Sequence, residues 1–71
     1  MRIERLVAMA NDIATFFECE TDRAAGARAV AAHLRRFWDP RMRREILAHL
    51  GRGGAGLSAL AREALTRLAS D

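Results

Sequence analysis

Apolar residues recur at three- and four-residue steps along most of the chain, which is the period of an amphipathic helix. The first such segment runs from about residue 3 to residue 18. Its apolar positions form one stripe: Ile3, Leu6, Val7, Ala10, Ile13, Ala14 and Phe17. Met9 and Phe16 lie seven residues apart, to one side of this stripe. They make the predicted apolar face wider than one small core needs.

A second helix is predicted after Thr21 and Asp22, whose side chains can cap its start. We expect it to continue to Phe37 or Trp38. Its apolar stripe consists of Ala27, Val30, Ala31, Leu34, Phe37 and Trp38. Pro40 ends this helix, because proline disfavours the helical conformation in the residue before it. The chain therefore turns sharply here, and the turn places Trp38 at a corner.

A third helix is predicted to begin at Pro40, since proline fits the first helical position and Asp39 can cap it. Its apolar residues are Met42, Ile46, Leu47 and Leu50. We expect Gly51 to end it in the left-handed conformation that favours glycine. A flexible, glycine-rich connection is expected to follow, up to residue 56.

The fourth predicted helix is capped by Ser58 and extends to about residue 69. Its apolar stripe consists of Leu57, Leu60, Ala61, Ala64, Leu65 and Leu68. No segment shows the alternating pattern of a strand. The pattern thus predicts an all-α fold: one domain over residues 1–71, built as a small bundle of four short helices.

The composition indicates a marginally stable chain that relies on a partner. The chain has 71 residues, and 15 of its hydrophobic residues are alanine, which buries little apolar area. A single cysteine, Cys19, excludes an internal disulfide. The apolar runs are too short to span a membrane, and the N-terminal run is too short for a secretory signal. We therefore expect a cytoplasmic protein.

No catalytic or metal-binding set can be assembled from the sequence. Cys19, His33 and His49 lie far apart, without the spacing of a zinc site. Cys19 would be a nucleophile only beside a base, and the sequence places none there. The glycines of residues 51–56 follow no strand, and no P-loop lysine follows them. We predict that this chain is not an enzyme by itself and binds no cofactor.

Arginines concentrate around the corner at Trp38. All 12 basic residues are arginine, against nine acidic ones, which gives a net charge of +3. Five of them, Arg35, Arg36, Arg41, Arg43 and Arg44, lie within ten residues. The cluster could be a solvated basic face, a phosphate-binding surface on which Trp38 stacks with a base, or a protein interface. Asp39 and Glu45 partly neutralise it, which favours the interface over nucleic acid.

Residues 33–43, His-Leu-Arg-Arg-Phe-Trp-Asp-Pro-Arg-Met-Arg, resemble the delta subunit of the soluble, NAD-dependent, molybdenum-containing formate dehydrogenases. Residues 6–14 and 53–57 fit the same family. The resemblance implies a non-catalytic accessory subunit of a cytoplasmic complex that oxidises formate to carbon dioxide and reduces NAD. It implies docking on the large catalytic subunit, which holds bis-molybdopterin guanine dinucleotide and iron–sulfur clusters, while other subunits carry FMN and further clusters.

In that family the subunit is linked with stability of the complex or with acquiring and retaining the molybdenum cofactor. The matching block implies a contact surface, with Trp38 as its anchor and with Arg41 and Arg44 pairing with partner carboxylates or helix ends. The predicted partner-binding residues are Arg35, Phe37, Trp38, Asp39, Arg41, Met42 and Arg44. Two alternatives stay open: a maturation factor that dissociates from the same enzyme, and a small helical nucleic-acid-binding protein.

Overall fold

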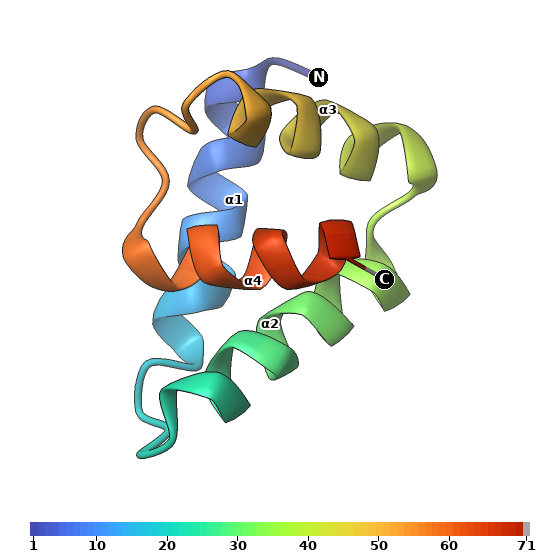
Figure 1. Cartoon of the computed structure of the whole chain (residues 1–71). Helices are drawn as coiled ribbons and strands as arrows, with labels where there is room; N and C mark the ends of the chain where they lie inside the picture. The colour runs from blue at the N-terminus through green and yellow to red at the C-terminus, as the bar shows by residue number, and fades with distance from the viewer. Residues whose placement is uncertain (71) are drawn as a thin grey trace.

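The computed structural model describes residues 1–70; Asp71, the last residue of the predicted domain, lies outside the described residues. These residues form four helices and no strand (Figure 1), so the predicted all-α fold is confirmed. The helices are α1 (Ile3–Phe16), α2 (Arg23–Phe37), α3 (Pro40–Gly51) and α4 (Ala59–Ser70). The first helix ends two residues earlier than expected, and the others match within one or two residues.

Helix α4 lies at the centre of the arrangement and contacts each of the other three helices. Its most extensive contact is with α2, and the two helices run in the same direction (Figure 1). Helices α1 and α2 diverge from the short turn that joins them, and α3 crosses near the start of α1. Helix α1 runs across α3 and α4, so the four helices are not all parallel or antiparallel to one another (Figure 1).

The core is closed by the chain itself. Its buried side chains come from all four helices and the segments next to them: Leu6, Ala10, Ala14, Ala27, Val30, Ala31, Leu34, Trp38, Ile46, Leu57, Leu60, Ala61, Ala64, Leu65 and Leu68. The accessible surface is 4469 Å², close to the roughly 4,400 Å² that surface scaling gives for a compact monomer of this mass. The buried residues form one cluster, against which further apolar side chains of the chain are packed.

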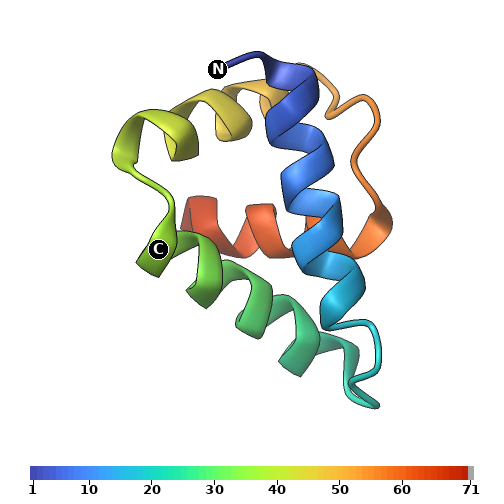
Figure 2. The same ribbon diagram turned by 180° about the vertical axis from the view of Figure 1, so that it is seen from behind.

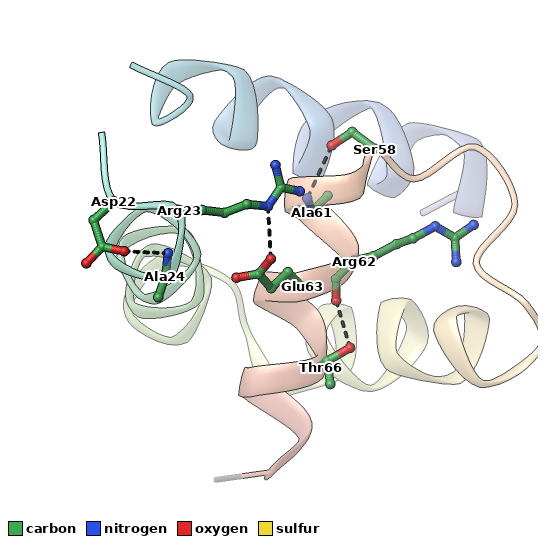
Figure 3. Close-up of polar contacts among 8 residues, drawn as sticks. All are labelled: Asp22, Arg23, Ala24, Ser58, Ala61, Arg62, Glu63 and Thr66. Atoms are coloured by element: carbon green, nitrogen blue, oxygen red, sulfur yellow. Dashed lines mark hydrogen bonds and ion pairs between the residues drawn. The ribbon is translucent and has the colours of Figure 1, made fainter. Parts of the chain in front are cut away.

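Three helices begin where the sequence predicted, with the predicted caps. The Asp22 carboxylate accepts a hydrogen bond from the Ala24 N–H at 3.0 Å, as Figure 3 shows. Ser58 Oγ accepts one from the Ala61 N–H at 3.2 Å. The Asp39 carboxylate does the same for the Met42 N–H at 2.8 Å, with proline in the first turn of α3. Each bond satisfies a backbone donor that the start of a helix leaves without an internal partner.

The sharp corner between α2 and α3 is held by an arginine. Arg43 Nη1 donates to the carbonyl oxygens of Arg35 and Trp38, at 2.9 and 2.6 Å. These carbonyls lie at the C-terminal end of α2, where the helix leaves acceptors free and where its dipole favours a positive charge. Arg43 therefore serves the fold by fixing the direction in which α3 leaves α2.

The predicted end of α3 is wrong. Gly51 belongs to the helix, and the left-handed glycines are Gly53, Gly54 and Gly56, with φ of +113°, +64° and +87°. The Gly54 N–H bonds to the His49 carbonyl, and the Gly53 N–H bonds to the Leu50 carbonyl. This pair of bonds is the Schellman motif, with Gly53 as its left-handed residue. The sequence offers several glycines in succession, and the bonds of the loop decide which of them ends the helix.

The loop after α3 is also not the flexible connection that we expected, because side chains from other helices hold its carbonyls. Arg62 of α4 donates to the Gly53 and Gly54 oxygens at 2.9 and 2.7 Å. Asn11 of α1 donates to the Gly56 oxygen and accepts from the Ser58 N–H, both at 2.9 Å. The loop thus fastens α3 and α4 to the middle of α1.

Candidate protein-binding surface

The seven predicted partner-binding residues do not share one environment. Five of them are exposed: Arg35, Phe37, Asp39, Arg41 and Arg44. Met42 is half-buried and packs against the core, and Trp38 belongs to the core with 5% of its surface exposed. The surface available to a partner at this corner therefore consists of Phe37 and charged side chains.

Trp38, the predicted anchor of the contact surface, lies in the core, and its role in binding a partner stays a prediction. Residue 38 has left the helical conformation, yet its N–H still bonds to the carbonyl of Leu34, one turn earlier. Its side chain therefore continues the buried stripe of α2, below Leu34. Phe37, which the sequence placed on the same apolar stripe, is 65% exposed. A tryptophan in the core stabilises the fold, and the neighbouring phenylalanine is the ring that a partner can reach.

Several charges of the arginine cluster have partners within the chain. Arg41 Nε lies 3.6 Å from Glu45 Oε1, one turn along α3. Asp39 caps α3, and Arg43 is held by the carbonyls at the end of α2. The guanidinium of Arg36 lies over the ring of Phe37, 5.4 Å from its centre. The cluster is thus a mixed charged and aromatic surface, as the acids in the sequence suggested.

Two aromatic rings stand out from the helical surface. Phe16 at the end of α1 is 75% exposed, and Phe37 at the end of α2 is 65% exposed. The wide apolar face predicted for the first helix is the signal for Phe16, which lies beside the buried stripe. His33 joins Phe37 to this surface, since their ring centres are 4.7 Å apart.

The residues with nucleophilic or metal-ligating side chains are dispersed. Cys19 is exposed in the turn after α1, with its Sγ 3.7 Å from the Phe16 carbonyl oxygen. His49 Nε2 lies 2.8 Å from the carbonyl oxygen of Ala55, within the glycine loop. Over residues 1–70, no three histidine, cysteine or acidic side chains are grouped so that they could hold a metal ion. In the same part of the chain, no helix has the length and apolarity needed to cross a membrane.

Fold and surface together define the class: a small all-helical protein whose distinctive surface is aromatic and basic. Comparison with family models identifies the family. Residues 5–65 match the model described as the NADH-dependent formate dehydrogenase delta subunit, FdsD. The match spans most of the chain, so the chain belongs to this family. Neither the curated proteins nor the solved structures contain a match.

Proposed function

We propose that this chain is a non-catalytic accessory subunit that docks on the large, molybdenum-cofactor-bearing subunit of a cytoplasmic formate dehydrogenase. The observation that carries the proposal is the exposure of Phe16 and Phe37 on a molecule whose core is already closed. Large apolar side chains grouped on a soluble surface mark sites of interaction. Family membership supplies the partner, because a delta subunit belongs to an enzyme complex.

The proposed role is structural: the bound chain would stabilise the complex or help the large subunit acquire and keep its cofactor. In this proposal the complex carries bis-molybdopterin guanine dinucleotide, iron–sulfur clusters and FMN on its other subunits. This chain contributes a rigid, preformed surface, since the loop and the corner next to its helices are pinned by Asn11, Arg62 and Arg43. A rigid surface loses little conformational entropy on binding.

The experiment that tests the proposal is purification of the complex through a tag on the large subunit, from cells with and without this chain. We expect the chain in the active, cofactor-loaded complex at a constant ratio to the large subunit. We also expect a complex lacking the chain to hold less molybdenum or to dissociate more readily. Recovery of the chain only with cofactor-free large subunit would identify it as the dissociable maturation factor. No association with either form would contradict both roles.

The nucleic-acid alternative makes a different prediction. Binding to DNA or RNA through arginines falls steeply as salt rises, because each phosphate contact releases counterions. A titration of the purified chain with a duplex and with a single strand at two salt concentrations measures this directly. We expect no salt-sensitive binding, since part of the arginine cluster is engaged by Glu45 and by backbone carbonyls.

A further inference from the structure

An apolar groove lies between α1 and α2. Viewed from the side shown in Figure 2, the two helices diverge from their connecting turn. The groove is open, has a volume of about 330 Å³, and is lined by Asp12, Ile13, Phe16, Phe17 and His33. Its wall is almost entirely apolar. The chain does not fill this groove with its own side chains, so apolar side chains of a partner can enter it.

The rings around the groove form two contacting pairs, one on each side. Phe16 and Phe17 meet edge to face, with ring centres 5.2 Å apart. On the opposite side, His33 continues to Phe37, at 4.7 Å between ring centres. Phe16 and Phe37 are two of the three large hydrophobic side chains that are exposed among the described residues. Aromatic side chains in such positions are the usual anchors of protein interfaces.

The charges next to the groove select the occupant. The guanidinium of Arg36 lies over the ring of Phe37. The two ion pairs described within residues 1–70 join Arg23 to Glu63 and Arg41 to Glu45, so neither of them involves Arg36. A carboxylate beside Phe37 would pair with this guanidinium. Asp12 lines the α1 side of the groove, where a carboxylate would be repelled. The complementary ligand is thus apolar in its centre and acidic on the α2 side.

A helix is the element that fits this site. The described chain has no strand, so a partner cannot bind by extending a sheet. An amphipathic helix placed in an apolar groove is the alternative mode, with anchors one turn apart. A second copy of this chain fits less well, because both copies carry a charge of +3.

We propose that the groove between α1 and α2 receives an acidic amphipathic helix of the formate dehydrogenase large subunit. Bulky apolar side chains of that helix enter between Phe16 and His33, and a carboxylate pairs with Arg36. This inference rests on the proposed function, because it takes its partner from it. The site is separate from the Trp38 corner that the sequence indicated, although Phe37 borders both.

The test is recovery of this chain with a tagged large subunit, for variants of the groove and matched controls. Replacing both exposed rings (Phe16→Ser with Phe37→Ser) should lower recovery by about tenfold or more, as for interface anchors. The conservative pair Phe16→Leu with Phe37→Leu should retain most of it. Arg36→Glu should lower recovery several-fold. Arg52→Glu makes the same charge change at an exposed position at the end of α3, beside Met1, and should have no effect.

The outcomes separate this inference from the proposed function. If the unaltered chain is not recovered with the large subunit, the proposed function fails, and this inference with it. If the chain is recovered and the groove variants are recovered equally well, the groove assignment is overturned while the proposed function stands. If the serine variants only break a homodimer seen by light scattering, a second copy is the occupant and the inference is wrong. Circular dichroism of each free variant shows whether it has folded.

Photo-crosslinking identifies the occupant directly. With p-benzoylphenylalanine in place of Phe16 or Phe37, irradiation of the complex should join the chain to one segment of the large subunit. That segment should be helical, with bulky apolar residues one turn apart and an acidic residue beside them. The same probe in place of Thr66, exposed on α4, is the control and should not capture this segment. Capture of a basic segment, or of the same segment by all three positions, would overturn the proposal.

Discussion

Helix α2 carries both buried and exposed side chains, and the two groups have different roles. The buried side chains hold the fold together, and we propose that the exposed ones bind a partner. One face carries Ala27, Val30, Ala31 and Leu34, which are fully or almost fully buried. At the edge of this stripe, His33 is half-buried and the larger Phe37 is 65% exposed. Side-chain size therefore does not decide burial here. Helix α4 packs against α2, whereas among residues 1–70 no helix covers the ring of Phe37.

The same division recurs in the two adjacent aromatic pairs of the molecule. In the pair of Phe16 and Phe17, the first ring is exposed and the second packs partly against the core. In the pair of Phe37 and Trp38, again the first is exposed and the second is buried. Neighbouring positions on a helix point about 100° apart. Only one ring of each pair can face the core, so substitutions within a pair should separate stability from binding.

The largest effect is expected for the buried member at the corner. Trp38→Ala should lower the free energy of unfolding by about 3–5 kcal/mol, because it removes a large buried side chain and leaves a cavity in the core. Urea denaturation followed by circular dichroism measures the change. In so small a domain we expect the variant to be partly unfolded at room temperature. A loss below about 1 kcal/mol would mean that the indole does not stabilise the core.

A second test compares two glycines at the end of α3: Gly54, where an added Cβ would meet a neighbouring side chain, and Gly51, where it would meet none. Gly54→Ala should cost about 1–3 kcal/mol, because a non-glycine residue is strained in the left-handed region. The position has φ +64°, and an added Cβ would lie 2.9 Å from Arg62 Nη1. Chemical denaturation of the purified chain measures this loss. An unchanged midpoint would show that the loop is not held by Arg62 as described.

The matched control for that substitution has the opposite sign. Gly51→Ala should raise the free energy of unfolding by about 0.5–1 kcal/mol, since glycine inside a helix costs conformational entropy. Gly51 is helical, and nothing lies within 4 Å of an added Cβ. Thermal unfolding of the two glycine variants side by side compares them. A destabilised Gly51→Ala would instead support the original expectation that this residue ends the helix.

The smallest effect on stability is expected for the exposed ring of Phe37. Phe37→Ser should change the free energy of unfolding by no more than about 0.5 kcal/mol, as for surface substitutions generally. The ring contacts His33 and Arg36 but is not part of the core. Thermal unfolding measured beside Trp38→Ala gives the comparison. If the two variants lost equal stability, the division of this aromatic pair into a folding and a binding member would be wrong.

Much of the fold could be predicted because the signals are local. A helix repeats every 3.6 residues, so the apolar stripes predicted four helices, and Asp22, Asp39 and Ser58 predicted where three of them start. The extra apolar width at Phe16 also predicted a face that the core does not use. The sequence alone did not decide whether Trp38 lies in the core or on the surface, because tryptophan is common both in cores and at interfaces. Only its alignment with Leu34 in the folded chain distinguishes the two.

The amino-acid sequence by itself determined the helices, their caps, the corner at Asp39 and Pro40, and the family to which the chain belongs. The tertiary structure alone decided which glycine ends α3, that Asn11 holds a loop distant from it in the chain, and which rings stay exposed. The physical reason is the range of the interactions. Capping and periodicity act within one or two turns, whereas the bonds from Asn11 to Gly56 and Ser58 exist only once α1 and α4 have met.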